Sequence, residues 1–195
     1  MEFIYPIGST PLELDEIEKL IPKHIRLQSE LNEWEQFNIL QANLWLKKQK
    51  TDLMNFTTIK FCKLLHKKMF DKIWKWAGEF RKTDKNIGID WLQISVSLTM
   101  LFDDLIYQIN HKTYTIDEIA VRFHHRLVYV HAFVNGNGRH ARVATDFLLT
   151  ILGQNIFSWG RNDLVFQNET RNKYIKALQF ADKGDYKLLL NFVRS

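Results

Sequence analysis

The sequence contains few of the residues that mark several large classes of protein. It has 3 prolines and 8 glycines among 195 residues, which argues against an all-β sandwich because that architecture needs many turns. Cys62 is the only cysteine, so the chain forms no intramolecular disulfide and no Cys-based metal cluster. No run of about 18 apolar residues occurs, and no transmembrane helix is therefore expected.

Neither the net charge nor the N-terminal sequence indicates a nucleic-acid partner, a membrane partner or secretion. Lys and Arg exceed Asp and Glu by 27 to 22, a net charge of +5, which favours an anionic partner only weakly. The basic residues are scattered, so no specific nucleic-acid partner is expected. The first residues lack the pattern of a signal peptide. Together with the single cysteine, this predicts a cytoplasmic protein without a membrane partner.

Apolar residues make up 46% of the chain, and most of them recur at helical spacing. Thr10-Pro11-Leu12-Glu13 predicts a helix start with Thr10 as the N-cap. A capping box beginning at Thr115 predicts a helix that runs to residue 130. Further helices are expected at about 11–20, 24–50, 57–76, 95–110, 139–152, 169–183 and 185–193. The segment 81–94, which we call the flap, contains Asn-Ile-Gly and predicts a small β-hairpin or an irregular loop.

The stretch HAFVNGNGRHAR, residues 131–142, joins two predicted helices. Gly136 and Gly138 allow positive φ angles and a close approach of the backbone to a ligand. The helix that follows begins with unpaired N–H groups and the positive end of the helix dipole, which together favour an anion. Arg139 and Arg142 are spaced to reach phosphates at this end. The loop is therefore a candidate phosphate cradle.

His131 lies at the edge of this cradle. An unperturbed histidine is largely neutral at cellular pH and can act as a general base. Since the loop contains no good nucleophile, the nucleophile would have to come from elsewhere, for instance a hydroxyl of a second substrate. A structural role remains the alternative at this point, because Asn-Gly turns between helices are common and a histidine at a helix end often serves as a cap.

The order of these residues resembles the Fic (filamentation induced by cAMP; Fic/DOC) family, whose signature is His-Pro-Phe-x-(Asp/Glu)-Gly-Asn-Gly-Arg-x-x-Arg. Segments 65–82 and 169–192 resemble the family as well, so most of the chain is covered. The resemblance implies an all-α, Fic-type helical bundle with a small β-hairpin flap. It implies a Fic domain over residues 51–195, preceded by an N-terminal helical extension over residues 1–50.

For function, the resemblance implies a protein adenylyltransferase, which transfers AMP from ATP to a Ser, Thr or Tyr hydroxyl of a target protein. On that basis His131 is the catalytic base and Phe133 anchors the loop. The target hydroxyl would be presented by the flap near residues 86–94. The implied nucleotide-binding residues are Gly136, Asn137, Gly138, Arg139 and Arg142.

The sequence departs from the signature at two positions. Ala132 replaces the usual proline. Asn135 replaces the Asp or Glu expected to hold Mg²⁺ (or Mn²⁺), and a neutral carboxamide binds such a cation more weakly than a carboxylate. Other nucleotide-dependent transfer, removal of AMP, or a degenerate module that only binds nucleotide or a partner are therefore alternative functions.

The N-terminal extension contains a partial match to the inhibitory pattern (Ser/Thr)-x-x-x-Glu-(Gly/Asn) of many relatives. Ser29 and Glu33 have the required spacing, although Trp34 follows. Glu30 is a rival for the same role. Either glutamate would form an ion pair with Arg142 and block the γ-phosphate, which makes autoinhibition an expectation. The target protein and any homo-oligomer are left open by the sequence.

Overall fold

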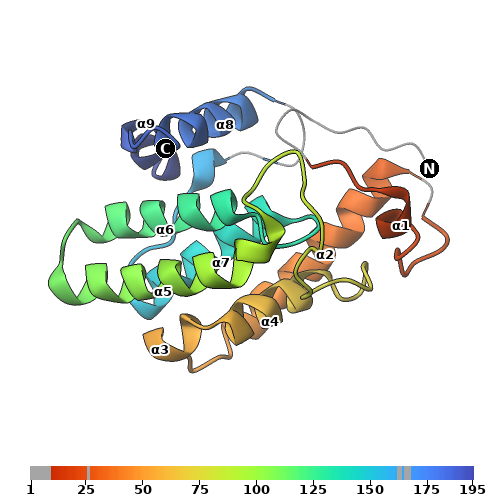
Figure 1. The fold of residues 1–195 in the computed structure, drawn as a ribbon, viewed down its shortest axis with the longest axis horizontal. Coiled ribbons are helices and arrows are strands. Elements are labelled where there is room, and N and C mark those ends of the chain that lie inside the picture. Colours follow the sequence, from red (N-terminus) through yellow and green to blue (C-terminus); the bar gives the residue numbers. More distant parts are fainter. Residues whose placement is uncertain (1–9, 26, 162–163, 165–167) are drawn as a thin grey trace.

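The computed structural model describes residues 10–25, 27–161, 164 and 168–195. In this part of the chain the protein is an all-α bundle with no β-strand, only two isolated bridges. Helices α5, α6 and α7 lie side by side, with α4 beneath them and the α8–α9 pair above them in the view of Figure 1. The helices are α1 (Leu14–Ile17), α2 (Gln28–Leu46), α3 (Leu53–Phe56), α4 (Ile59–Phe70), α5 (Ile94–His111), α6 (Ile116–Val130), α7 (Asn137–Ile151), α8 (Glu169–Ala181) and α9 (Lys187–Val193), with short 3₁₀ turns η1 (Trp91–Gln93) and η2 (Trp159–Arg161).

The long helices occur where the apolar periodicity predicts them. Thr115 caps α6 by accepting a hydrogen bond from the Glu118 N–H at 3.3 Å, as predicted, whereas the Glu118 side chain accepts from Arg122. Helix α4 is shorter than predicted: it ends at Phe70, and the following residues form a turn that leads to Gly78 at φ +83°. The side chains of Ile73, Trp74 and Trp76 from this turn are still buried in the core.

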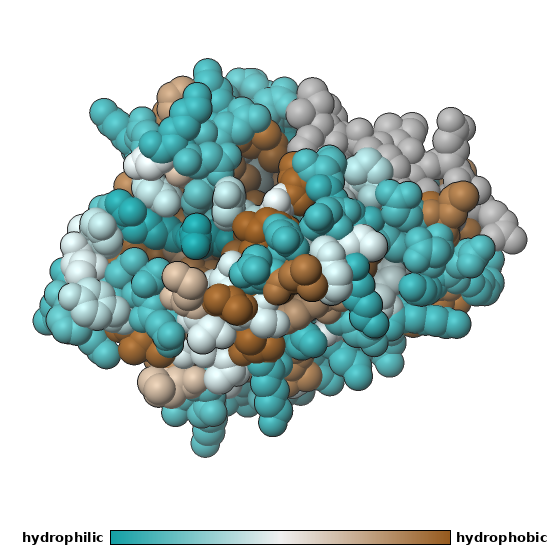
Figure 2. All heavy atoms as spheres, viewed as in Figure 1, coloured by the Kyte–Doolittle hydropathy of each residue, from teal (hydrophilic) through white to brown (hydrophobic). Residues whose placement is uncertain are grey.

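The apolar core has two parts. The larger part joins α2, α4, α5, α6 and α7, and the smaller part lies beneath α8, α9 and η2. Figure 2 shows that hydrophobic residues also interrupt the hydrophilic surface near the centre of that view. Within the described residues, no helix is both long and apolar enough to cross a bilayer.

Residues 10–25 and 27–46 form what we call the N-terminal cover, which packs against α4 and the turn after it. The Ile21 N–H donates to the Ile73 carbonyl at 2.8 Å, and the Asn38 side chain hydrogen-bonds the backbone of Lys68 and Lys72 at 3.0 Å. These contacts fix α2 along α4.

The start of the N-terminal cover differs from the prediction. Helix α1 begins at Leu14 with Glu13 as its N-cap, where the Glu13 N–H donates to Glu16 Oε2 at 2.8 Å. The prediction that Thr10 caps this helix is wrong. Its hydroxyl instead lies 2.9 Å from Nε2 of His131, more than a hundred residues away in the sequence.

Candidate active site

The motif loop, residues 131–138, connects the end of α6 to the start of α7. His131 ends α6 in the left-handed conformation, at φ 52° and ψ 53°, which is unfavourable for a residue with a Cβ. Gly136, the N-cap of α7, has φ +78°, and a Cβ at this position would lie 2.6 Å from the Phe70 ring. The loop therefore needs glycine at residue 136 for both backbone and steric reasons.

Side chains within the loop and from α4 hold it in place. The Asn137 side chain accepts from the Phe133 N–H at 2.9 Å and donates to the Phe133 carbonyl at 2.8 Å. The buried Phe133 ring stacks on His66 at 3.8 Å between ring centroids. Nδ1 of His66 accepts from the Gly78 N–H, and Nε2 lies 3.0 Å from the Asn135 carbonyl, so His66 links α4 to the loop.

These contacts change the expected role of Asn137. The resemblance assigns it to nucleotide binding, but its side-chain amide is 4% exposed and is used to close the loop. Only its backbone, at the first position of α7, faces the anion end of the helix. At Gly138, by contrast, the nearest heavy atom that a Cβ would meet is Arg142 Nη1 at 3.8 Å, which leaves open space beside the helix N-terminus.

His131 is buried among positive charges. Its side chain is 6% exposed. Burial lowers its pKa to about 4, the charges of Arg81 and Lys85 act in the same direction, and the Val128 backbone opposes them. The ring is therefore neutral at physiological pH, as a general base requires. Among the described residues, no atom meets hydrogen-bond geometry at the buried Nδ1.

Arg81 connects the flap to His131. Its Nε donates to the His131 carbonyl at 2.7 Å, Nη1 donates to the Thr83 carbonyl at 2.8 Å, and Nη2 donates to the Ile89 carbonyl. Gly88 packs against His131 so closely that a Cβ there would lie 2.6 Å from the Cβ of His131. The Asn-Ile-Gly sequence thus serves this close approach at φ +103°, and the predicted β-hairpin is absent from the fully described flap.

A hollow of about 510 Å³ lies beside the flap. Residues of α4, the flap and the start of α5 form its wall, which combines apolar and basic side chains. It is lined by Lys63, Glu79, Phe80, Arg81, Lys82, Trp91, Leu92, Ile94 and Ser95.

Arg139 and Arg142 carry positive charge in the first two turns of α7, and Arg171 lies near the start of α8. The charges of Arg142 and Arg139 both lower the pKa of Arg171, after the larger effect of its burial. Arg142 lies over the Tyr174 ring at 5.7 Å, and the Tyr174 hydroxyl is 2.8 Å from Nε2 of His124. Such a cluster of like charges at a helix N-terminus is suited to an anion with several charged oxygens.

The carboxylate that pairs with this cluster comes from α2. Oε2 of Glu35 lies 2.5 Å from Nη1 of Arg139, and Oε1 accepts from the Trp74 indole N–H at 2.7 Å. Glu35 is 5% exposed. The two glutamates considered from the sequence lie elsewhere: Glu33 is exposed, and Glu30 accepts the Leu27 N–H at the start of α2.

The surroundings of Asn135 do not fit a metal ion held by the protein. Its Oδ1 accepts from the Gly136 N–H at 2.6 Å and lies 3.4 Å from Nη2 of Arg139, while Nδ2 donates to the Thr10 carbonyl at 3.1 Å. The only side-chain oxygen offered thus faces two donors, one of them cationic. No group of three His, Cys, Asp or Glu side chains with metal-binding geometry occurs in the described part of the chain.

Four residues at the site were not found by sequence reasoning: Thr10, Glu35, Arg81 and Arg171. Glu35 is one residue beyond the segment matched to the inhibitory pattern, and only its burial distinguishes it from Glu30 and Glu33. Arg81 and Arg171 are single basic residues among 27, so no local pattern separates them. Burial raises the pKa of Cys62 to about 12, which leaves its thiol protonated and poorly nucleophilic.

Comparison with known proteins identifies the arrangement. The family model described as Fic/DOC matches residues 56–149, which include α4, the flap and the motif loop. The chain contains a Fic/DOC family domain. A protein adenylyltransferase Fic from Aedes aegypti is 28% identical over 120 residues, and protein adenylyltransferase fic-1 from Caenorhabditis elegans is 31% identical over 121 residues. These alignments cover 60% of this chain but only 23% and 22% of the two relatives.

Solved structures share the fold of this Fic/DOC chain. BepC from Bartonella tribocorum, solved with bound AMPPNP, has a TM-score of 0.69 at 19% identity and is matched over 93% of this chain and 97% of its own. Fic-1 from C. elegans also has a TM-score of 0.69, at 22% identity, with 93% of this chain and 52% of that chain covered. At these identities the likeness establishes the fold alone.

Proposed function

We propose that this Fic/DOC chain is a protein adenylyltransferase, which transfers AMP from ATP to a hydroxyl of a target protein. The observation that carries the proposal is the pairing of a buried, neutral His131 with the N-terminus of α7, whose first two turns carry Arg139 and Arg142. A base and a polyanion site at opposite ends of one loop suit an in-line displacement at phosphorus. The relatives named as adenylyltransferases and the nucleotide analogue bound by BepC support the same chemistry.

In the proposed reaction the target hydroxyl gives its proton to Nε2 of His131 and attacks the α-phosphorus of ATP. The new P–O bond forms as the bond to the β-phosphate oxygen breaks, and pyrophosphate leaves. The backbone of Gly136 and Gly138 and the first N–H groups of α7 hold phosphate oxygens, while the arginines offset the charge on the leaving group. No residue of this chain is assigned to a metal ion, because Asn135 does not offer a free oxygen.

The target segment is proposed to lie along residues 86–94, next to Gly88 and the hollow beside the flap. Gly88 is the flap residue in direct contact with His131, so a chain that follows the flap passes the base. The basic residues Lys63 and Lys82 line the hollow and favour a target segment with acidic residues.

Autoinhibition is proposed to come from Glu35. The phosphates of ATP and the Glu35 carboxylate compete for the same guanidinium, that of Arg139. Because the pair is largely buried, at 7% and 18% side-chain exposure, displacing Glu35 costs more than displacing a surface carboxylate. In this arrangement residues 1–50 act as the regulatory extension and residues 51–195 as the catalytic domain.

The deciding experiment measures ATP binding and AMP adducts for four proteins: unmodified, Glu35→Gln, Glu33→Gln and His131→Ala. Glutamine at 35 still accepts from the Trp74 indole but carries no charge to pair with Arg139. We expect Glu35→Gln to bind ATP about tenfold more tightly, which corresponds to one charge-assisted contact of about 1.4 kcal/mol. Glu33→Gln, on the exposed face of α2, serves as the matched control and should behave as the unmodified protein.

Adducts are sought by mass spectrometry after incubation with ATP, Mg²⁺ and a cell lysate. AMP on lysate proteins that increases with Glu35→Gln and disappears with His131→Ala supports both the reaction and the role of Glu35. If the proteins bind ATP but no variant forms an adduct, the transferase proposal is wrong and the chain is a module that only binds nucleotide. Equal adduct yields from Glu35→Gln and Glu33→Gln would remove Glu35 from the inhibitory role.

A further inference from the structure

A hydroxyl of the chain itself lies at the proposed catalytic base. Oγ1 of Thr10 is 2.9 Å from Nε2 of His131, which is the distance of a hydrogen bond and the geometry that a general base needs toward the hydroxyl it deprotonates. The Thr10 residue is 5% exposed. While Thr10 is in this position, no hydroxyl of another protein can reach Nε2.

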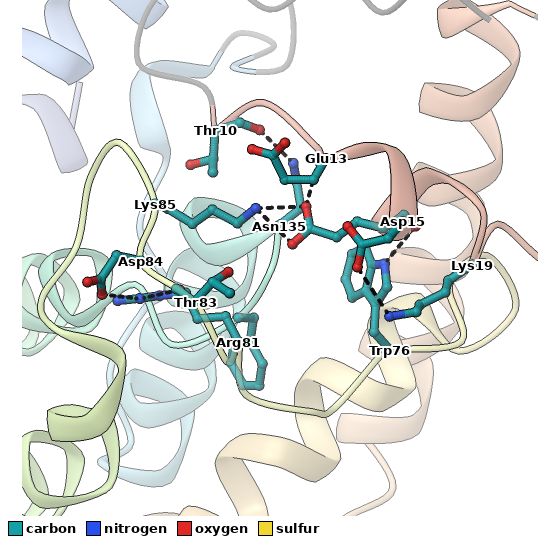
Figure 3. Close-up of polar contacts among 12 residues, drawn as sticks. Thr10, Glu13, Asp15, Lys19, Trp76, Arg81, Thr83, Asp84, Lys85 and Asn135 are labelled. Atoms are coloured by element: carbon teal, nitrogen blue, oxygen red, sulfur yellow. Dashed lines mark hydrogen bonds and ion pairs between the residues drawn. The ribbon is translucent and has the colours of Figure 1, made fainter.

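Further contacts hold the Thr10 backbone in place. The Nδ2 group of Asn135 donates to the Thr10 carbonyl at 3.1 Å, so the residue that departs from the family signature contacts the same threonine (Figure 3). A carboxylate at position 135 could not donate this bond. The hydroxyl and the carbonyl of Thr10 are thereby held by two residues of the motif loop, His131 and Asn135.

The segment after Thr10 is tied to the flap. Nζ of Lys85 lies 2.7 Å from both carboxylate oxygens of Glu16 in α1, and the two side chains are only 4% and 9% exposed (Figure 3). The ion pair thus ties α1 to the flap, and the flap itself contacts His131 through Gly88 and Arg81. Pro11 restricts the backbone directly after Thr10, which limits the freedom of the hydroxyl to leave.

We propose that Thr10 is the acceptor of an intramolecular AMP transfer, so that the chain modifies its own N-terminal segment. The proposal rests on the proposed adenylyltransferase function. In this step Oγ1 of Thr10 transfers its proton to Nε2 of His131 and forms a bond to the α-phosphorus of ATP. The bond between that phosphorus and the β-phosphate oxygen breaks, and pyrophosphate is released.

Two features favour an acceptor over a purely structural contact. A threonine that only closed the loop would be served equally well by its backbone carbonyl, which Asn135 already binds. The hydroxyl adds a contact to the one nitrogen that the proposed chemistry uses. The step also needs only ATP, which the proposed function already supplies, and one molecule of protein accepts one AMP.

The experiment uses the Glu35→Gln protein, in which ATP has access to Arg139, and compares Thr10 with Thr10→Val and Thr10→Ser in that background. After incubation with ATP and Mg²⁺, tandem mass spectrometry locates AMP within the peptide that contains Thr10. The location matters because Ser9 is adjacent in the sequence. We expect one AMP on Thr10 or on its serine replacement, none on the valine variant, and none when His131→Ala is added.

Intramolecular transfer gives a rate constant that does not change with protein concentration. As a second check, a tagged His131→Ala protein is mixed with the Thr10→Val enzyme and should receive no AMP on its intact Thr10. The Thr10→Val variant has no hydroxyl that competes for Nε2 of His131, so its labelling of lysate proteins should increase about fivefold. This factor corresponds to the loss of one net hydrogen bond of about 1 kcal/mol.

The outcomes separate this proposal from the function on which it rests. If lysate proteins acquire AMP and Thr10 does not, the self-acceptor is overturned while the adenylyltransferase function stands. Transfer to the tagged His131→Ala protein at the same rate would overturn the intramolecular route. If neither Thr10 nor any lysate protein acquires AMP despite ATP binding, the function itself fails and Thr10 fails with it.

Discussion

The motif loop and the N-terminal cover meet at His131, but different kinds of contact hold them. The motif loop is enclosed by the core: Phe133 is 1% exposed, stacks on His66 and is bound at both backbone groups by Asn137. The cover reaches the site through single polar contacts from Thr10, Glu16 and Glu35. The motif loop is therefore a rigid part of the core, whereas polar substitutions can detach the N-terminal cover from the site.

Substitutions in these two regions should therefore have different effects, one on the free energy of unfolding and the other on access to His131 and Arg139. Disturbing the motif loop should cost folding free energy, because apolar burial and buried hydrogen bonds are lost. Disturbing the cover should change access to His131 and Arg139 with a smaller loss of stability.

The largest expected effect is a loss of stability at acid pH, caused by the buried histidines in and around the motif loop. Burial is the main cause of the lowered pKa values of His66, His124, His131 and His140, which are about 3 for His124 and about 4 for His131 and His140. Protons bind the unfolded chain more readily, so stability is lost as pH falls from about 6.5 towards 4, by about 2 kcal/mol per histidine at pH 5. Asp146, whose pKa burial raises to about 6, acts in the opposite direction as a single group.

The measurement for acid is urea unfolding at pH 7, 6 and 5. A steep loss below pH 6.5 is expected, and the His140→Gln variant should show a shallower slope because it removes one of the titrating groups. A free energy of unfolding that is constant between pH 7 and 5 would contradict the buried neutral histidines.

Truncation of Phe133 to alanine should remove about 3–5 kcal/mol from the free energy of unfolding, the usual cost for a buried phenylalanine. The cavity would lie beneath the loop that carries Gly136, so ATP binding should weaken as well. Phe180→Ala, at a side chain that is 40% exposed, provides the matched control. Similar losses for the two variants in urea unfolding would refute the anchoring role.

The Asn135→Asp variant should act mainly on the cover. It replaces the Nδ2 donor by an oxygen that faces the Thr10 carbonyl, so one hydrogen bond worth about 1 kcal/mol is lost and the cover is released from the loop. Hydrogen exchange should increase at residues 10–20 and remain unchanged in α6. The isosteric change keeps the size of the side chain, and exchange that increases equally in both segments would mean that the whole fold, and not the cover, had loosened.

The smallest effect on stability is expected for Glu16→Gln combined with Lys85→Met. Glutamine at 16 can still accept the Glu13 N–H, and removing both charges together avoids an unpaired buried ion, so the expected change is below about 1 kcal/mol. Glu16→Gln alone leaves the Lys85 ammonium buried without its partner and should cost about 3 kcal/mol. A double variant as unstable as the single one would show that the ion pair has no separate role in closing the flap.

Sequence reasoning worked best where one local signal decided the outcome. The capping box at Thr115, the apolar stripe of α6 and the glycines of the motif loop act within a few residues of one another, and the structure has the corresponding helix and turn. It failed at Thr10, where a good capping sequence is overridden by a contact with His131. For the flap, the structure has the irregular loop and not the β-hairpin of the two predicted alternatives, because Gly88 serves a close approach to His131.

The all-α class, the position of the long helices and the loop that joins a histidine to two arginines could be predicted from the sequence, because these features follow from spacing along one chain. Packing of distant segments sets which acidic residue meets Arg139 and which hydroxyl lies at His131. Glu35 and Thr10 come from segments far from the motif loop in the sequence. Glu35 meets Arg139 and Thr10 meets His131 only because α2 and the segment that begins at Thr10 pack against the α6–α7 loop. Burial then set the charge of His131, since desolvation exists only in the folded chain.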